Sequence, residues 1–430
     1  MRSTTYDTAA EVRPKAVLVS LVTDEVKRSG IDPVYSLEEL MALAETAGVE
    51  VLSTVSQNRE TKDTKWFIGK GKVQELKVVA DELGANTAIF DQELSGAQVR
   101  NLEEELDLKI IDRTQLILDI FAQRAKTREG IIQVELAQLS YLLPRLAGQG
   151  GNLSRLGGGI GARGPGETKL ETDRRHIRGR IDELRRQIGE VERHRTLQRQ
   201  RRKKSGTVQV ALVGYTNAGK STLLRQLTDA DVYVENQLFA TLDPTSRMLE
   251  LPGGREVVLT DTVGFIQNLP HHLIAAFRAT LEEVNEADLV LHVIDASSDM
   301  LGDHIKVVDG ILEELGSAGT SQIRIYNKKD LCTPEQLELL PEDEHNLRLS
   351  AYNESDLERL LNRLQEELTG GTVTYRIPAA RGDLSAQLYK IGEVVSQEFE
   401  EEDVVYEVRL HTGEAEKYTY LLEDYKVDRS

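Results

Sequence analysis

The chain has 430 residues, of which 40% are hydrophobic, and 53 Lys and Arg against 72 Asp and Glu give a net charge of −19. This composition excludes global disorder, and the length predicts two to four domains. Because no apolar run reaches about 18 residues and the N-terminal segment has no apolar core, neither a membrane span nor a signal peptide is expected. The single cysteine, Cys332, excludes an internal disulfide and is typical of a cytosolic protein. We expect the protein to be a monomer.

Residues 1–125 are expected to form a small α/β subdomain. Helical patterns at 37–47, 72–83 and 96–106 alternate with short apolar segments, which predict buried strands at 15–21, 49–55, 86–90 and 108–112. This alternation is typical of a parallel sheet covered by helices. No nucleotide-binding fingerprint follows any of these strands.

Residues 126–205 are predicted to form an antiparallel helical hairpin. Apolar side chains recur at alternating spacings of four and three, at Ile132, Leu136, Leu139, Leu143 and Leu146 and at Ile177, Ile181, Leu184, Ile188 and Val191. Two such stripes form a narrow apolar seam between packed helices. The segment between them is rich in glycine and cannot pack a core. It is either a disordered linker or, because a stiff hairpin would hold it outward, a loop that contacts a partner.

Positive charge is concentrated in this hairpin. Residues 151–204 include sixteen Lys and Arg and seven Asp and Glu, a net charge of +9, so the remainder of the chain carries −28. The acidic total argues against nucleic acid, but the basic segment is typical of a surface that binds a polyanion. The other interpretation is a solvated helix whose charges maintain solubility.

A phosphate-binding loop follows the apolar strand predicted at residues 207–213. It matches G-x-x-x-x-G-K-[ST] between a strand and a helix, through Gly214, Tyr215, Thr216, Asn217, Ala218, Gly219, Lys220 and Ser221. The glycines let backbone amides surround phosphates at a helix N-terminus. Lys220 supplies a cation for the β- and γ-phosphates, and the Ser221 hydroxyl is a ligand for Mg²⁺.

A second motif follows the strand predicted at 256–260, and comprises Asp261, Thr262, Val263 and Gly264. The Asp261 carboxylate fits the surroundings of Mg²⁺, and the Gly264 amide can bond the γ-phosphate. Phe265 stands where Ras-like enzymes place a water-orienting glutamine, so a distal group or a partner must orient the water. Between these motifs, residues 236–247 should supply a second Mg²⁺ ligand, with Thr241 and Thr245 as candidates.

Two further motifs predict that the base is guanine. Asn327, Lys328, Lys329 and Asp330 follow the strand at 323–326 and resemble the N-K-x-D motif of regulatory GTPases. Asp330 would accept bonds from two guanine nitrogens, Lys328 would cover the base, and Asn327 would tie this loop to the phosphate loop. Ser350 and Ala351, with Tyr352 beside them, follow the strand at 347–349, and their amides would meet guanine O6. Residues 206–370 are therefore predicted to be a P-loop domain that binds GTP and GDP.

The last part of the chain, residues 371–430, is predicted to be a small α+β domain. Its pattern indicates a strand at 372–378, a helix extending to Phe399, and a strand at 404–410. The predicted fold class is therefore α/β and multidomain, with this appendage following the subdomain, the hairpin and the P-loop domain.

Several segments together closely resemble the HflX family of translational GTPases, in its bacterial form: GGIGARGPGETKLETDRR within residues 157–175, GYTNAGKSTL, FATLDPT, DTVGFI and NKKD. The resemblance covers most of residues 10–370. It implies that the first switch contains Phe239, Ala240, Thr241, Leu242 and Asp243, and it assigns the Mg²⁺ threonine to Thr241. Asn217 matches an asparagine of potassium-activated GTPases, which implies K⁺ as an activator. Lys220, Thr241, Gly264 and Asn217 are then the expected catalytic residues.

The resemblance also implies a partner. A family member would be a cytosolic GTPase that associates with the large (50S) ribosomal subunit, and that either splits stalled ribosomes or helps subunit maturation. Residues 157–175 and the basic hairpin would contact ribosomal RNA. The alternative is an RNA-binding assembly or remodelling factor whose nucleotide site is mainly regulatory.

Overall fold

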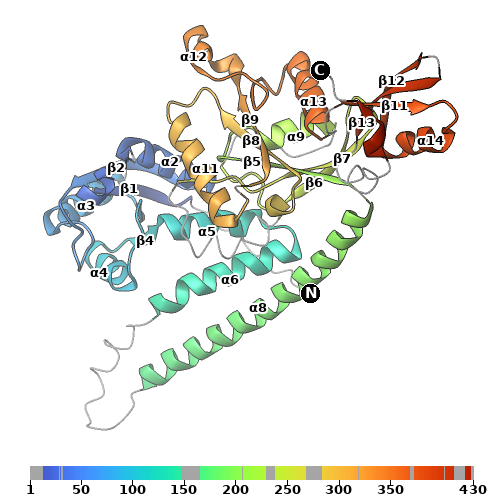
Figure 1. Ribbon diagram of the computed structural model, residues 1–430. Coiled ribbons are helices and arrows are strands. Elements are labelled where there is room, and N and C mark those ends of the chain that lie inside the picture. The colour runs from blue at the N-terminus through green and yellow to red at the C-terminus, as the bar shows by residue number, and fades with distance from the viewer. Residues whose placement is uncertain are drawn as a thin grey trace, which may run out of the picture. The chain divides into compact units, whose positions relative to one another are not determined.

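The computed structural model (Figure 1) describes residues 13–28, 30, 32–146, 165–205, 207–228, 238–267, 283–317, 319–368, 372–400, 402–410 and 422–427. The chain divides into two compact units. The first comprises Met1–Arg195, Val234–Asp243 and Val263–Leu281, and the second comprises Thr196–Tyr233, Pro244–Thr262 and Glu282–Ser430. None of the described helices has the length and apolar character needed to cross a bilayer.

The first unit contains a four-stranded sheet in the order β2-β1-β3-β4. All of its pairings are parallel, which confirms the predicted parallel α/β subdomain. Its strands are β1 (Lys15–Val22), β2 (Glu50–Asn58), β3 (Thr87–Phe90) and β4 (Lys109–Asp112). The β1 residues from Ala16 onward and all of β3 are buried, as expected for central strands covered on both faces.

Several helices of the first unit begin at residues whose side chains cap them. Asp32 caps α2 with Pro33 at its first position, and Ser95 and Gln98 form a capping box on α4. Helix α5 was not predicted; it starts directly after β4, where the Asp112 carboxylate accepts a bond from the Gln115 amide. The helices are α1 (Asp24–Arg28), α2 (Pro33–Thr46), α3 (Lys70–Leu83), α4 (Gly96–Leu106), α5 (Arg113–Arg124), α6 (Arg128–Arg145) and α8 (Pro165–Ser205), the last up to Arg195.

Helices α6 and α8 lie side by side (Figure 1), and ion pairs join them. Ile132, Ile181 and Leu184, from the two apolar stripes noted in the sequence, are buried. Arg180 binds Glu135 with both nitrogens at 2.7 Å, and Arg195 lies 2.9 Å from Glu129. Residues 147–164, which include most of the glycine-rich loop, lie outside the described residues.

The second unit contains a six-stranded sheet in the order β10-β9-β8-β5-β7-β6. Its strands are parallel except β6, which runs antiparallel to β7. They are β5 (Val208–Gly214), β6 (Thr245–Glu250), β7 (Glu256–Asp261), β8 (Leu289–Asp295), β9 (Ser321–Asn327) and β10 (Asn346–Arg348). The accompanying helices are α9 (Lys220–Thr228), α11 (Leu301–Leu315), the 3₁₀ turn η2 (Lys329–Leu331), α12 (Pro334–Leu339) and α13 (Glu354–Leu368).

The C-terminal part forms an antiparallel sheet in the order β12-β13-β11-β14, packed with one helix. Its elements are β11 (Thr372–Pro378), α14 (Gly382–Ile391), β12 (Gly392–Glu400), β13 (Asp403–Leu410), η3 (Glu423–Tyr425) and β14 (Lys426–Val427). The α+β prediction is confirmed, but the helix predicted to reach Phe399 is wrong. It ends at Ile391, because Gly392–Glu400 form β12, of which eight residues pair with β13, and pairing with a neighbour overrides a weak helical preference.

Arg113, the first residue of α5, is a buried cation of the first unit. Its guanidinium lies 2.7 Å from Glu39 and 2.9 Å from Asp91, and it also donates to the Ser36 carbonyl at 2.9 Å. Burial alone would lower the pKa of Arg113, but the two carboxylates raise it above its ordinary value. The three side chains therefore form a charged cluster that links α2, α5 and the segment after β3.

Replacing Arg113 by alanine should strongly destabilise the first unit. Two carboxylates would remain buried without their cation, which costs about 3–5 kcal/mol. Trp66, the only tryptophan of the chain, packs on the core of this unit, so its fluorescence during urea denaturation reports the loss. Lys72→Ala is the control, because its ion pair with Glu75 lies on the surface and contributes less than about 1 kcal/mol. Equal midpoints for the two variants would contradict the prediction.

Candidate nucleotide-binding site

The phosphate-binding loop joins the end of β5 to α9, and its two motif glycines stand where a side chain cannot fit. Gly214 has φ +153°, and an added Cβ would overlap the Val293 carbonyl of β8. Gly219 has φ +99°, and an added Cβ would overlap the side-chain amide of Asn327. Only glycine combines a positive φ with such close approach. The glycine pattern read from the sequence therefore reflects contacts with two neighbouring strands.

Lys220 is buried within this loop. Its ammonium donates to the carbonyl oxygens of Gly214 at 3.0 Å and Tyr215 at 2.9 Å. Burial lowers the pKa of Lys220 to about 8, against an opposing effect of the Asp261 carboxylate. A phosphate oxygen is a stronger acceptor than a carbonyl, so the ammonium is prepared to bind an anion that enters the loop.

Ser221 and Asp261 bring two oxygen ligands together beside this lysine. The Ser221 hydroxyl donates to the Asp261 carboxylate at 2.7 Å, and Asp261 is fully buried at the end of β7. Hydroxyl and carboxylate oxygens are the ligand types that Mg²⁺ prefers, so these residues fit a magnesium ion. Thr262 instead donates its hydroxyl to the Leu212 carbonyl, which gives it a structural role between the strands.

Asn327 links three of the predicted motifs. Its side-chain nitrogen donates to the Ala218 carbonyl at 2.9 Å, and its oxygen accepts from the Ala351 amide at 3.1 Å. Asn327 is buried, so each bond replaces water that the group has lost. The phosphate loop, the end of β9 and the segment after β10 are thereby fixed relative to one another.

The remaining residues of the predicted guanine site lie around this asparagine. Lys328 has φ +63°, and its ammonium lies 2.6 Å from Asp295. Asp330 is exposed in the turn η2. Ser350 and Ala351 are buried, whereas Tyr352 is 70% exposed. The chain thus presents an accessible carboxylate next to the loop that Asn327 holds.

Two acidic residues of this region were not predicted. Asp356, buried in the first turn of α13, accepts from the Ser350 amide at 2.9 Å and from Lys329 at 2.6 Å. It therefore joins the NKKD loop to the next motif. Asp295 could have been found from its place at the carboxyl end of β8, since parallel strands end at the same edge of a sheet. No sequence signal pairs Asp356 with Lys329, which lies 27 positions earlier.

The other residues of the phosphate loop differ in exposure. Tyr215 is buried and stacks on His304 with ring centroids 3.8 Å apart, and burial lowers the pKa of His304 to about 4. Thr216 and Ala218 are buried as well. Asn217 is exposed with φ +60°, a conformation that asparagine tolerates better than most residues. Asn217 is thus available to a ligand at the surface of the loop.

The predicted switch residues belong to the first unit. Phe239 and Leu242 are buried, while Ala240, Thr241 and Asp243 are half-buried. Val263, Gly264 and Phe265 are all buried. Thr245, the second candidate for the magnesium threonine, lies in β6 of the second unit and pairs with Asp261 in the antiparallel ladder.

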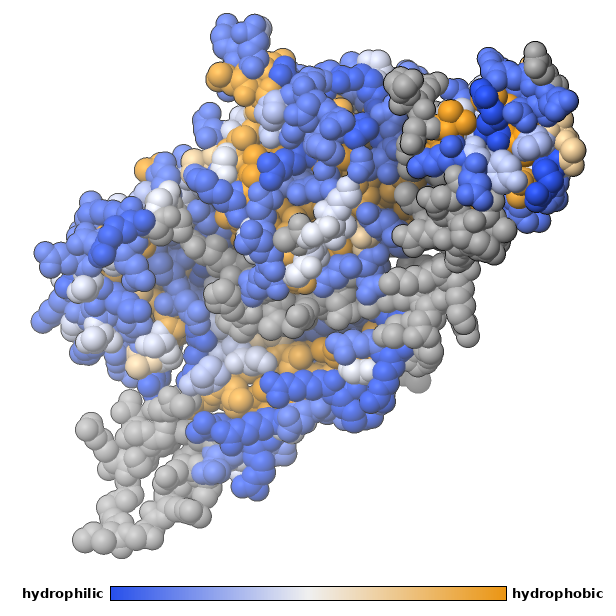
Figure 2. Space-filling model, viewed as in Figure 1, coloured by the Kyte–Doolittle hydropathy of each residue, from blue (hydrophilic) through white to orange (hydrophobic). Residues whose placement is uncertain are grey.

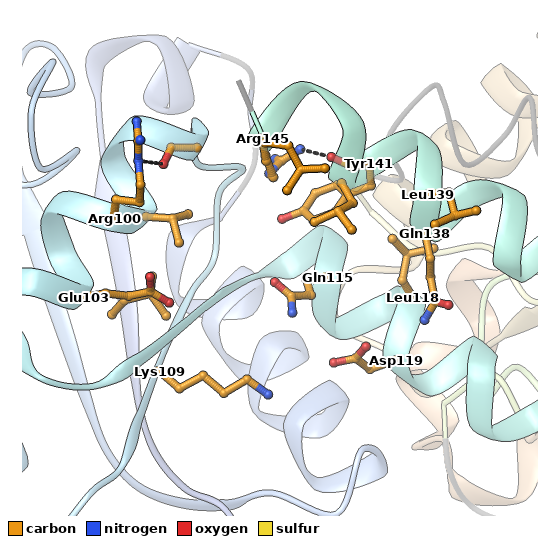
Figure 3. A pocket seen from close by; sticks show the side chains of 15 residues that line it. Arg100, Glu103, Lys109, Gln115, Leu118, Asp119, Gln138, Leu139, Tyr141 and Arg145 are labelled. Carbon is orange, nitrogen blue, oxygen red and sulfur yellow. Dashed lines mark hydrogen bonds between the residues drawn. The ribbon is translucent and has the colours of Figure 1, made fainter. Parts of the chain in front are cut away.

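A cavity of about 490 Å³ opens in the first unit between α4, β4, α5 and α6 (Figure 3). Its charged side chains have both signs, with Arg100, Lys109 and Arg145 against Glu103 and Asp119. Burial raises the pKa of Asp119, and Lys109 opposes that rise. This mixed lining lacks the glycine-rich loop and the concentrated positive charge of a phosphate site.

Three family models match consecutive parts of the chain. "GTP-binding GTPase N-terminal" matches residues 34–122, "GTP-binding GTPase Middle Region" matches 124–202, and "50S ribosome-binding GTPase" matches 209–328. Together they span most of the first unit and the phosphate-binding part of the second.

Curated relatives are similar over most of their length. The chain is 51% identical to GTPase HflX of Caldanaerobacter subterraneus subsp. tengcongensis over 398 residues, which cover 92% of this chain and 90% of that protein. It is 44% identical to GTPase HflX of Escherichia coli (strain K12) over 372 residues, 85% of this chain and 87% of that protein. Among solved structures, a GTP-binding protein of Sulfolobus solfataricus in complex with GDP is 25% identical with a TM-score of 0.43, over 82% of this chain and 98% of that one.

Nucleotide affinity should decrease as the pH rises above about 8. Phosphates beside Lys220 would raise its pKa, so the bound state holds more protons than the free state, and binding weakens once the free lysine loses its proton. A fluorescent GDP analogue should bind about tenfold more weakly at pH 9 than at about pH 7.5. Lys220→Met should bind the GDP analogue weakly at both pH values, and its affinity should not change between them. An affinity of the unaltered protein that is flat across this range would contradict the argument.

Proposed function

The chain belongs to the HflX family of GTPases, and on that premise we propose that it uses GTP binding and hydrolysis to act on the large ribosomal subunit in the cytosol. The "50S ribosome-binding GTPase" description of the matching family model supports this proposal. The observation that carries it is an arginine-rich helix in a chain whose remainder is strongly acidic.

Residues of the phosphate loop bind and orient the triphosphate in this proposal. Lys220 leaves its two carbonyl acceptors for the β- and γ-phosphates, and the Gly264 amide bonds the γ-phosphate. Ser221 and Thr241 supply hydroxyl oxygens to Mg²⁺, which when bound would neutralise charge on the phosphates. Asp261, bonded to Ser221, would orient that hydroxyl.

Guanine is recognised by the loop that Asn327 fixes. Asp330 accepts hydrogen bonds from two nitrogens of guanine, and adenine has no donor at the first of them. Lys328 lies over the base, and the amides near Ala351 meet its oxygen. The exposure of Asp330 and the buried bonds of Asn327 support this assignment, since the carboxylate is accessible while its loop is held in place.

Phe265 cannot orient the attacking water, because its side chain is apolar and buried. We propose that K⁺ bound by the Asn217 amide oxygen supplies transition-state charge, and that the ribosomal partner completes the site. The exposed position of Asn217 supports an accessible oxygen at this point.

Exchanging K⁺ for Na⁺ should slow GTP turnover by about tenfold or more, the effect of losing one electrostatic contact to the transition state. Asn217→Gly retains the backbone, because glycine accepts φ +60°, and removes the oxygen. This variant should turn over equally slowly in both salts. If it still distinguishes K⁺ from Na⁺, the cation does not use Asn217.

The proposed RNA-binding surface is the exposed face of α8. Arg175, Arg178 and Arg193 are exposed, and within the described part of the chain they form no ion pair. Arg180 and Arg186, by contrast, bind Glu135 and the Glu183 and Glu190 pair. Figure 2 shows the described part of α8 as a hydrophilic surface. Guanidinium groups without a protein partner are suited to bind phosphates.

The double variant Arg175→Gln and Arg178→Gln should bind isolated 50S subunits at least about tenfold more weakly. The slope of the logarithm of the binding constant against the logarithm of the salt concentration should become shallower by roughly two. Sedimentation with 50S subunits and a non-hydrolysable GTP analogue measures this. The double variant Arg180→Gln and Arg186→Gln loses the same charge from arginines that glutamates already neutralise, and should bind nearly normally.

Equal weakening in both double variants would show that net charge acts without a specific surface. Normal binding by the first variant would exclude this face of α8. Strong stimulation of GTP turnover by 50S subunits favours a switch enzyme, whereas binding without stimulation favours the alternative, an RNA-binding assembly factor with a regulatory nucleotide site.

A further inference from the structure

The cavity of about 490 Å³ between α4, β4, α5 and α6 lies wholly within the first unit, where residues between Gly96 and Leu146 line it. Its volume is within the range of sites that bind small molecules. Each of the four elements contributes apolar side chains to the lining, namely Val99, Ile110, Leu118, Leu139 and Leu142. The cavity can therefore hold the apolar part of a small organic molecule.

Contacts at one end of the cavity fix its shape. The Arg145 guanidinium lies 3.4 Å from the centre of the Tyr141 ring. Glu93 and Asp112 lie 2.9 and 3.4 Å from the same guanidinium, so carboxylates neutralise its charge. An added Cβ on Gly96 would lie 2.9 Å from the backbone of Arg145, so α4 and the end of α6 are in close contact. The cavity is therefore preformed at this end, as sites for small molecules usually are.

Two side chains of opposite charge face the cavity. Figure 3 shows Lys109 of β4 and Asp119 of α5 pointing toward each other. Neither side chain forms a hydrogen bond or an ion pair with any residue in the described part of the chain. Asp119 is half-buried, and burial raises the pKa of its carboxyl against the opposing effect of Lys109. A half-buried carboxylate without a hydrogen-bond donor costs free energy, so a cationic group that enters the cavity would be stabilised beside it.

The other charged side chains of the lining are solvated or bonded within the protein. Glu103 is exposed, and Arg100 donates to the Gly96 carbonyl at 3.3 Å. Arg145 is neutralised by its two carboxylates. Lys109 and Asp119 are thus left for a ligand, and their charges sum to zero. A ligand that satisfies both must carry one negative group, one positive group and no net charge.

Two glutamines add neutral polar groups beside these charges. Gln115 lies four positions before Asp119, so both are on the same face of α5, and Gln138 of α6 also lines the cavity. The side chains of both glutamines form no hydrogen bond with another described residue. An amide donates as well as accepts, so each can complete the hydrogen bonds of an ammonium or of a carboxylate.

We propose that this cavity binds an α-amino acid with an apolar side chain. The ammonium of the ligand bonds Asp119, its carboxylate bonds Lys109, and its side chain contacts the apolar walls. An α-amino acid carries both charged groups on one carbon atom, which suits a cation and an anion that point toward each other without forming an ion pair. The apolar walls disfavour a charged ligand side chain, which would lose its water there. The site belongs to the first unit alone and does not depend on the proposed ribosomal role.

The test uses L-phenylalanine with 2-phenylethylamine and 3-phenylpropionate, each of which keeps the ring and one of the two charged groups. Calorimetric titration of the full-length protein at neutral pH should give a Kd on the order of 1 mM or lower for phenylalanine. Each analogue should bind at least about tenfold more weakly, because it lacks one charge-assisted hydrogen bond. If either analogue binds as tightly as phenylalanine, the cavity does not recognise both charges and the inference is wrong.

Two variants assign each charge of the ligand to one side chain. Asp119→Asn should weaken binding of phenylalanine and 2-phenylethylamine about tenfold and leave 3-phenylpropionate unaffected. Lys109→Met should weaken binding of phenylalanine and 3-phenylpropionate and leave 2-phenylethylamine unaffected. Asp81→Asn and Lys70→Met remove the same charges from exposed positions of α3 outside the cavity, and they should bind phenylalanine normally. Fluorescence of Trp66 during urea denaturation checks that each variant is folded.

Phenylalanine binding that survives both cavity variants would place the ligand elsewhere on the protein and overturn the inference. Two further amino acids test the apolar walls. L-Leucine should bind with an affinity comparable to that of phenylalanine, whereas L-aspartate should bind at least about tenfold more weakly, because its side chain is charged. Equal binding of L-aspartate and phenylalanine would show that the walls do not select the ligand, which would also contradict the proposal.

Discussion

The side chain of Asn327 is the contact on which the nucleotide site depends. It is buried, it donates to the phosphate loop and it accepts from the segment after β10, so one amide fixes three loops that begin on different strands. Gly219 is required because any Cβ there would occupy the space of this amide. Asp356 repeats the arrangement further out, between Lys329 and Ser350. The loops thus have a defined geometry before a nucleotide enters, which reduces the ordering entropy that binding must overcome.

Buried charge organises the first unit in a similar way. Arg113 satisfies Glu39 and Asp91 in the interior and also donates to the Gln267 carbonyl. A buried ion cluster adds little net stability compared with apolar packing, but it specifies one arrangement of the elements that contribute to it. Here it specifies how α2, α5 and the residues after Gly264 lie together.

The distribution of charge gives the chain a single strongly basic element. Residues 151–204 carry +9 while the rest carries −28, so most of the surface repels a polyanion and the hairpin attracts it. On α8 the arginines divide into those paired with glutamates, of which Arg180 and Arg195 join α8 to α6, and those without an ion pair among the described residues. Binding of RNA through the second set would leave the ion pairs between α6 and α8 unchanged.

The sequence by itself determined the P-loop, the NKKD motif, the parallel α/β character of the first subdomain and the family, because each rests on local patterns of glycine, charge and hydrophobic periodicity. It did not determine α5, because the apolar residues of this helix follow β4 directly and gave no separate signal. It did not determine β12 either, because these residues suit a helix as well as a strand until β13 pairs with them. The motifs themselves were readable, whereas the partners of Arg113 and Asp356 were not. Arg113 bonds residues that lie 22 and 154 positions away along the chain. Asp356 bonds Lys329, which lies 27 positions earlier. These separations follow no recurring spacing. Only the tertiary structure brings such groups together, because long-range packing has no period along the chain.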